Sequence, residues 1–201
     1  MSLTKTILDG HEVEYNDSEF EVRCSHLHYV GNGINVTNPK GNTSCYCMFQ
    51  DYKGTSLDLS NFDTSNVTDM SFMFDACNNL SYLNLSNFDT GNVRDMSFMF
   101  HSCINLEHLN LSNFNTNKVT DRSFMFHACM NLKTLDISSF YIDNTKILDN
   151  MFWNCINLKT LKVGSDYLQF FSINRGLLEI GNNVNIIPVS KLDKTVEDLF
   201  Y

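Results

Sequence analysis

Residues 71–96 read SFMFDACNNLSYLNLSNFDTGNVRDM, and this phrase recurs with small changes until about Val163. A fixed period of this size means that one supersecondary unit is stacked on copies of itself, because a single unit cannot bury its own apolar face. The sequence therefore predicts a solenoid whose function lies in a repeated surface. The residues that return every 26 positions are Cys77, Cys103, Cys129 and Cys155; Leu83, Leu109, Leu135 and Leu161; Phe74, Phe100, Phe126 and Phe152; and Phe62, Phe88, Phe114 and Phe140.

Each unit begins with a short strand. In LSYLNLSNF, which starts at Leu80, apolar residues at the first, fourth and sixth positions point inward, and Tyr82 and Asn84 point outward. A turn rich in Asn, Asp and Thr follows, whose side chains bond their own backbone. The next segment, TDMSFMF, begins with Thr68-Asp69, which suits a helix N-cap, and its spacing predicts about one turn of α- or 3₁₀-helix.

Length and composition place the chain among packed single domains. It has 201 residues, 43% of them hydrophobic, and only 2 prolines, which argues against disorder. The formal net charge is −9 and no Lys/Arg cluster interrupts it, so neither nucleic acid nor an anionic membrane surface is an expected partner. No apolar stretch approaches the roughly 20 residues that span a bilayer, so membrane insertion is not expected. The start, MSLTKTILDGHEVEY, lacks the apolar core of a secretory signal.

The period divides the chain into three expected regions. Residues 1–47 form an N-terminal β-rich cap, residues 48–163 hold one degenerate repeat and four regular ones, and residues 164–201 form a C-terminal cap. In the first cap, HEVEY and FEVRC alternate like strands, and LHYVGNGINV predicts a hairpin that turns at Asn32-Gly33. In the last region, YLQFFSI and LLEIGNNVNIIPV look like strands, and a short amphipathic helix is expected after Ser190.

The cysteines of the repeat look structural. Equivalent side chains on adjacent rungs lie about 4.8 Å apart, beyond the mean Cβ separation of about 3.8 Å in a disulfide. We expect this column to consist of buried, reduced thiols. Outside the column, the CSHLH segment (24–28) and the CYC segment (45–47) leave three interpretations open: buried thiols, one disulfide in the cap, or a zinc site whose spacing fits no common pattern.

Three polar columns also follow the period, and each has a structural interpretation. The amides of Asn61, Asn87 and Asn113 would satisfy turn backbone from rung to rung, with Ser139 in the decaying repeat, rather than form a ligand ladder. The acidic column would cap helices, because one carboxylate per rung supplies too few oxygens for calcium. His101 and His127 lack further metal ligands, so we expect them at exposed convex positions. The acidic column consists of Asp69, Asp95 and Asp121.

The pattern FxxCxxLxxLxL, seen in FDACNNLSYLNL, FHSCINLEHLNL, FHACMNLKTLDI and FWNCINLKTLKV, resembles the leucine-rich repeats of the BspA-like bacterial surface proteins. The accompanying LSNFDTSNVTDMSFMF is similar to their variant with a Val-Thr-Asp-Met segment after the strand. The resemblance implies a right-handed, curved α/β repeat solenoid, mostly β, with a parallel sheet on its concave side. It also implies a surface-exposed binding or adhesion protein rather than an enzyme.

The outward strand positions are therefore the candidate binding surface, since the concave faces of solenoids commonly bind partners. Tyr82 is the residue of a type favoured at binding hot spots, and His108 occupies the same position one repeat later. An equally weighted interpretation is that small polar residues simply keep the sheet soluble. The candidate residues are Asp58, Tyr82, Asn84, His108, Asn110, Thr134, Asp136 and Lys162.

Two functional hypotheses follow. The first is a non-enzymatic binding module for protein or glycan, displayed at the cell surface or secreted as an adhesin-like protein. The second is an intracellular or secreted effector that binds a target protein through the same solenoid. Neither requires a cofactor or a metal ion, and the sequence contains no signature of a catalytic site. The oligomeric state cannot be read from the sequence.

Overall fold

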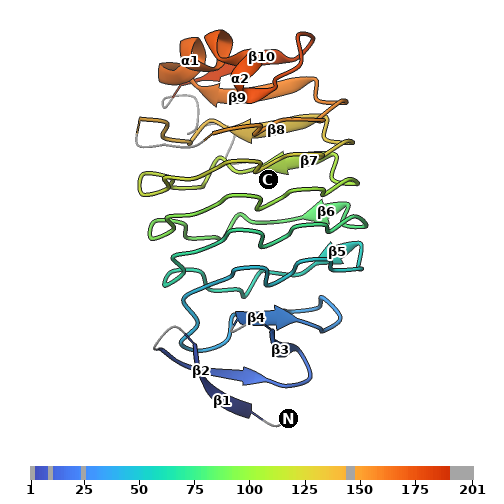
Figure 1. Cartoon of the computed structure of the whole chain (residues 1–201), viewed down its shortest axis with the longest axis vertical. Coiled ribbons are helices and arrows are strands. Elements are labelled where there is room, and N and C mark those ends of the chain that lie inside the picture. Colours follow the sequence, from blue (N-terminus) through green and yellow to red (C-terminus); the bar gives the residue numbers. More distant parts are fainter. Residues whose placement is uncertain (1–2, 9–10, 24–25, 144–147, 191–201) are drawn as a thin grey trace.

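The computed structural model describes residues 3–8, 11–23, 26–143 and 148–190. The chain winds into a stack of rungs along its long axis, with β1 to β4 at one end and α1, α2 and β10 at the other (Figure 1). The predicted solenoid, mostly β with few helices, is confirmed.

One side of the stack, which we call the strand face, carries short strands that pair in parallel with strands of adjacent rungs. The register joins equivalent positions of consecutive repeats, for example Leu109 with Leu135 and Leu135 with Leu161, so the 26-residue period is the pairing register itself. The parallel strands form two sheets, in which the strand orders are β5-β6 and β10-β9-β8-β7. The strands are β5 (Ser56–Leu57), β6 (Tyr82–Leu83), β7 (His108–Asn110), β8 (Thr134–Ile137), β9 (Thr160–Gly164) and β10 (Asn185–Val189).

The other side of each rung, which we call the turn face, does not contain the predicted helical turn. The Phe72 N–H donates to Ser97 O at 2.9 Å, and Phe74 N–H donates to Met99 O at 2.9 Å, so these donors bond the next rung rather than carbonyls one helical turn back. Tight turns, such as Met73 N–H to Met70 O, alternate with these ladder bonds. The spacing of apolar residues does not distinguish a helical turn from a run of tight turns, because both bury the same positions.

Stacked aromatic rings fill the interior. The first ring column lies fully inside, with neighbouring centroids 5.4–5.7 Å apart. A second column, led by Phe62, stacks at 6.0–6.4 Å. Each rung thus supplies part of the apolar cover of its neighbours, as the period predicted. The first column consists of Phe49, Phe74, Phe100, Phe126 and Phe152.

The cysteine column is free of disulfides, as expected; Cys77, Cys103 and Cys129 are buried and Cys155 is partly buried. Each thiol donates to a backbone carbonyl of the preceding rung; for Cys103 the acceptor is Phe74 O at 3.1 Å. Burial raises the pKa of the Cys155 thiol to about 12 and raises that of Cys129 well above its usual value. The thiols therefore stay protonated and act as small core residues.

Asn87 and Asn113 have the structural role predicted for the asparagine column, whereas Asn61 Nδ2 donates to the side-chain oxygen of Asn35 at 2.6 Å. Asn87 Nδ2 donates to Leu59 O and Ser60 O, and Asn113 makes the equivalent bonds one rung later. Where the repeat decays, Ser139 Oγ donates to Leu111 O at 3.0 Å instead. The carbonyls of Leu59, Leu85 and Leu111 also accept the backbone N–H three residues later, so the side chain adds a second hydrogen bond there and ties adjacent rungs together.

Two antiparallel hairpins form the N-terminal end. β1 (Leu3–Leu8) pairs with β2 (His11–Asn16), and β3 (Phe20–Arg23) pairs with β4 (His26–Tyr29). The strands predicted for HEVEY and FEVRC are confirmed, but the hairpin predicted to turn at Asn32-Gly33 is wrong.

Gly33 does adopt the positive φ that its turn chemistry suggested, at +80°. It uses that freedom to enter the stack. Asp58 N–H donates to Gly33 O at 2.8 Å, and Val36 N–H donates to Asp58 O at 2.9 Å. Rung-to-rung bonding thus begins well before the sequence repeat becomes recognisable.

The C-terminal end closes the stack with short helices and one more strand. Residues 167–173 were predicted as a strand, but Leu168–Ile173 is the helix α1, which follows the 3₁₀ turn η1 (Ser165–Tyr167) and precedes α2 (Arg175–Leu178). A short apolar run is ambiguous between strand and helix, and here Phe171 turns inward while its neighbours stay accessible. LLEIGNNVNIIPV was also predicted as strand: its end, Asn185–Val189, is confirmed as β10, but its first two residues belong to the helix α2. The helix predicted after Ser190 lies outside the described residues.

Candidate functional site

The strand face carries the outward column that the sequence predicted. Tyr82 is 64% exposed, whereas its neighbour Leu83 is buried. His108 and Thr134 follow at the equivalent positions of the next rungs and are also exposed. His108 Nδ1 lies 2.7 Å from Thr134 Oγ1, which holds the imidazole toward the next rung.

A second column of candidate residues on this face is occupied by turn formation. The side-chain oxygens of Asp58, Asn84, Asn110 and Asp136 each accept the backbone N–H two residues later, at 3.0–3.1 Å. Hydrogen bonds from Ser60 lower the pKa of the Asp58 carboxyl. Lys162, the last member, lies 3.8 Å from Asp136 across adjacent rungs. These residues shape the sheet corner before they offer anything to a ligand.

The turn face holds an aromatic column that the sequence analysis did not recognise. Phe72, Phe98 and Phe124 are half-buried, and their rings stack at 4.5 and 4.7 Å, nearly parallel. Tyr46 contacts the first ring edge-on at 5.8 Å. Their 26-residue spacing is present in the sequence, but the prediction singled out only the Phe74 and Phe62 columns.

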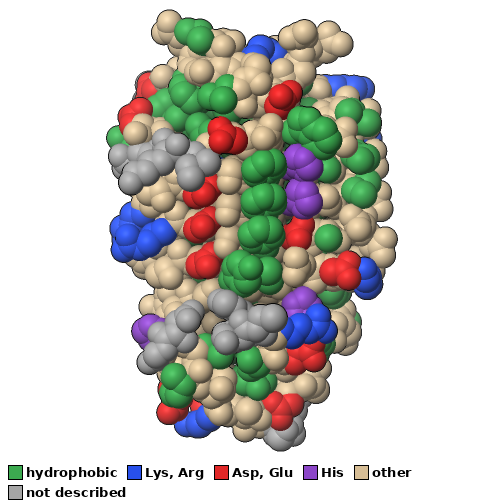
Figure 2. Space-filling view, in the orientation of Figure 1, with side chains coloured by type: hydrophobic (Ala, Val, Ile, Leu, Met, Phe, Trp, Pro, Cys, Tyr) green, Lys and Arg blue, Asp and Glu red, His purple; other side chains and the backbone are tan. Residues whose placement is uncertain are grey.

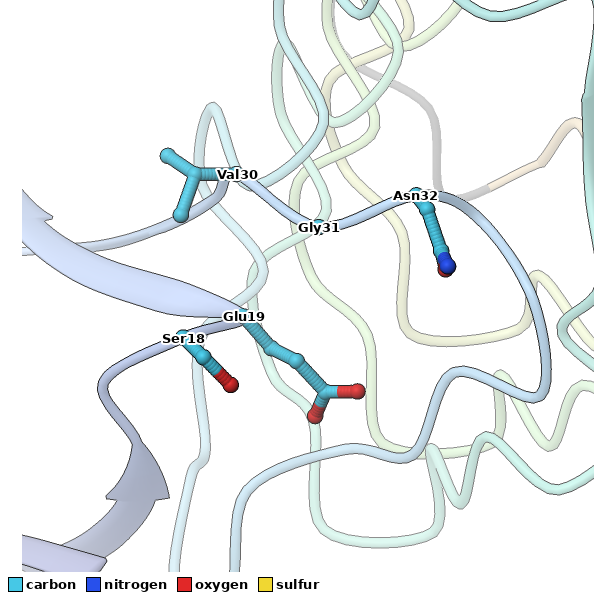
Figure 3. A pocket seen from close by; sticks show the side chains of 5 residues that line it. All are labelled: Ser18, Glu19, Val30, Gly31 and Asn32. Carbon is cyan, nitrogen blue, oxygen red and sulfur yellow. The ribbon is translucent and has the colours of Figure 1, made fainter. Parts of the chain in front are cut away.

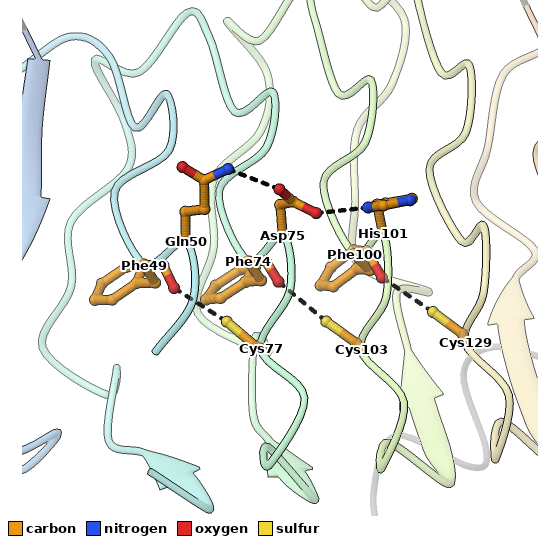
Figure 4. Close-up of polar contacts among 9 residues, drawn as sticks. All are labelled: Phe49, Gln50, Phe74, Asp75, Cys77, Phe100, His101, Cys103 and Cys129. Carbon is orange, nitrogen blue, oxygen red and sulfur yellow. Dashed lines mark hydrogen bonds and ion pairs between the residues drawn. The ribbon is translucent and has the colours of Figure 1, made fainter. Parts of the chain in front are cut away.

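A mixed column of polar and aromatic side chains also follows the rungs, and Figure 4 shows its first members, Gln50, Asp75 and His101. Asp75 accepts from Gln50 Nε2 at 2.7 Å through one oxygen and lies 2.6 Å from His101 Nδ1 through the other. His101 stacks on His127 at 4.7 Å, and His127 stacks on Trp153 at 4.5 Å. We expected the histidines at exposed positions, but both are half-buried, because each ring is covered by its neighbours and by a Phe edge.

Desolvation, followed by repulsion from His101, lowers the pKa of His127. Its Nδ1 is buried and makes no hydrogen bond. The imidazole is therefore held neutral near pH 7.

The acidic column caps turns rather than helices. Asp95 Oδ1 accepts the Ser97 N–H at 2.8 Å and the Ser97 hydroxyl at 2.7 Å, and Asp69 and Asp121 repeat this arrangement. Backbone bridges connect the three positions. The expected capping chemistry is thus present, but the element that it caps is a tight turn.

The N-terminal end offers little that could act as a site. A shallow hollow of about 440 Å³ lies beside the β3 hairpin and is lined by Ser18, Glu19, Val30, Gly31 and Asn32 (Figure 3). His28 Nδ1 lies 3.0 Å from Cys47 O, and Cys45 is a buried free thiol whose pKa is raised by desolvation. Cys24 and the side chain of His26 lie outside the described residues. Within the described ranges, no three His, Cys, Asp or Glu side chains gather as metal ligands would.

Parallel strands in a 26-residue register make this molecule a β-solenoid repeat protein. Residues 43–163 match the model of a family described as Mycoplasma protein of unknown function, DUF285, and the chain belongs to that family. Comparison with curated proteins and with solved structures gives no significant match. None of the helices in the described part of the chain has the length and apolar character that crossing a bilayer demands.

Proposed function

We propose that this protein is a non-enzymatic binding module that recognises a protein or glycan through its strand face. The observation that carries the proposal is the exposure of Tyr82, 64% accessible on a face of small polar side chains. An exposed tyrosine on a rigid element supplies contact area at low entropic cost, because its ring has few rotamers to lose. Unlike the rings of the turn face, it has no aromatic neighbour stacked on it among the contacts of the described residues.

Side-chain hydrogen bonds to the backbone divide the eight candidate residues into two columns. Tyr82, His108 and Thr134 point outward without holding a turn, whereas Asp58 and its equivalents are bonded to the backbone. We therefore assign the leading contacts to the Tyr82 column and a supporting role to the Asp58 column. Contacts of this size are individually weak, so useful affinity would come from many displayed copies.

Display outside a bacterial cell is part of the proposal and rests on the resemblance to BspA-like surface proteins. Antibody labelling of intact source cells tests it directly. We expect labelling without permeabilisation. Labelling that requires permeabilised cells would instead favour the intracellular effector.

The binding surface itself is tested with immobilised extracellular-matrix proteins and a glycan array. We expect the double variant Tyr82→Ala with His108→Ala to bind a positive ligand about tenfold more weakly. Its thermal stability should stay close to wild type, because both side chains are exposed. Phe98→Asn on the turn face is the matched control and should leave this affinity unchanged. Equal binding by the double variant would remove the strand face as the site.

A further inference from the structure

The aromatic column on the turn face lies at the surface of the stack and is not part of the buried core. Figure 2 shows a continuous hydrophobic column on the outside of the stack, with acidic side chains along one flank and histidines along the other. Ring contacts with Phe98 at 5.5 Å and Phe124 at 5.6 Å place His101 and His127 beside the rings. Phe72, Phe98 and Phe124 are only half-buried, so each presents a ring edge to solvent.

Phenylalanine occupies these positions against the preference of the backbone. Phe72, Phe98 and Phe124 all have φ of 56°, in the left-handed region that favours Gly, Asn and Asp. At the last rung the equivalent residue is Asn150, with φ of 53°, which suits that conformation. Stacking between neighbouring rings offsets part of the cost, but it does not require that the rings stand at the surface. A solvent-facing aromatic column of this kind is typical of a surface that a partner covers.

The stacking geometry decides which class of partner fits. Both faces of Phe98 are covered by neighbouring rings at 4.5 and 4.7 Å, so only edges are available. A sugar ring, which would stack on an aromatic face, finds none in the middle of this column. A second copy of the chain is also disfavoured, since its own acidic flank would meet Asp69, Asp95 and Asp121 and each copy carries a formal charge of −9.

We propose that the turn face docks a basic protein segment, separate from the ligand of the strand face. Lysine or arginine side chains would reach the acidic flank, and their alkyl stems with neighbouring apolar residues would lie along the Phe edges. Asp95 can contribute because the turn uses its Oδ1, while its second oxygen takes no part in that turn. The exposed Arg94 directly precedes Asp95 and its charge opposes that of the carboxylate. The partner's cations are therefore expected beside Asp69 and Asp121 as well.

The experiment measures the fluorescence anisotropy of a labelled synthetic peptide in which lysines alternate with leucine and threonine. The first comparison peptide replaces every lysine by glutamate, and the second replaces every leucine by serine. We expect the full-length protein to bind the lysine–leucine peptide. It should not bind the glutamate peptide, and it should bind the serine peptide only weakly. Failure to bind the lysine–leucine peptide would overturn the proposal, as would equal binding of the serine peptide.

Matched variants separate this face from general electrostatics. Phe98→Asn, which installs the residue found at position 150, should weaken binding about tenfold. Asp95→Asn keeps the turn acceptor but removes the charge, and should weaken binding about threefold. Asp58→Asn removes one charge on the strand face, together with the acceptor of the Asn35 N–H, and should have no effect on peptide binding.

An equal loss with Asp58→Asn and Asp95→Asn would reduce the binding to overall acidity and overturn the proposal. Asp95→Asn also keeps the test decisive if Phe98→Asn fails to fold. Tyr82→Ala should leave peptide binding intact, so failure here and failure of the proposed strand-face function are distinguishable.

Discussion

One buried position departs from the apolar pattern of its column. Arg122 takes the place that Met70 and Met96 occupy in earlier rungs, and its side chain is fully buried. Nη2 donates to Thr116 O and Tyr141 O, and the guanidinium lies 5.5 Å from the Phe140 ring centroid. Among the described residues, Nε and Nη1 have no hydrogen-bond partner, and desolvation lowers the pKa of this group to about 10. The buried guanidinium is therefore only partly compensated.

We expect Arg122→Met to raise the free energy of unfolding by about 1–4 kcal/mol, because an apolar side chain replaces a poorly compensated buried charge. Urea denaturation followed by circular dichroism measures it. Arg94→Met, at an exposed position one rung earlier, is the control and should change little. A less stable Arg122→Met variant would show that the guanidinium bonds are worth more than their desolvation cost.

The Asp58 turn makes a second prediction, on pH. Hydrogen bonds from Ser60 lower the pKa of Asp58, and equivalent bonds from Ser65 lower that of Asp63. Since the folded pKa lies below the unfolded one, this stabilisation is present above the ordinary carboxyl pKa and is lost as pH falls through the folded value. Ser60→Ala should therefore raise the pKa of Asp58 in an NMR titration and leave that of Asp63 unchanged. An unshifted Asp58 would assign its low pKa to another cause.

Among the elements, the cysteine column has the clearest chemical consequence. Burial raises the pKa of Cys45, Cys103 and Cys129, so the nucleophilic thiolate is scarce and shielded. We expect these thiols to resist a thiol-reactive reagent in the native protein and to react fully in denaturant. Mass spectrometry of the labelled peptides identifies each site. Rapid native labelling of Cys103, the middle of the column, would mean that the rungs open locally.

The elements also show what the sequence could and could not predict. The columns of Leu, Phe, Cys and Asn follow from the period alone, and so does the outward direction of Tyr82 and His108. The turn face could not be predicted by a local window, because its deciding bonds, such as Phe72 N–H to Ser97 O, join residues 25 positions apart. Asp58 and Asn84 looked available as ligands for a different reason: their outward strand positions do not reveal that their oxygens accept the N–H two residues later.

At the scale of the whole molecule, each rung contacts mainly its neighbours, so rungs should be removable as units. Deletion of residues 91–116 joins Thr90 to Asn117 and removes one complete period. We expect a folded, shorter and somewhat less stable protein, whereas deletion of residues 91–103 should prevent folding by putting the columns out of register. Circular dichroism and small-angle scattering measure the two. Equal disruption by both deletions would contradict the neighbour-only description.

Pro188 in β10 has a consequence for how the molecule ends. Asn185 N–H donates to Lys159 O, and peptide groups alternate between the two edges of a strand, so Pro188 lies on the edge turned away from β9. Proline has no N–H to offer there. A strand added to the outer edge of β10 would need a backbone donor at each alternate position. At Pro188 that donor is missing, which weakens pairing of a further parallel strand, including one from another molecule, at this edge of the described sheet.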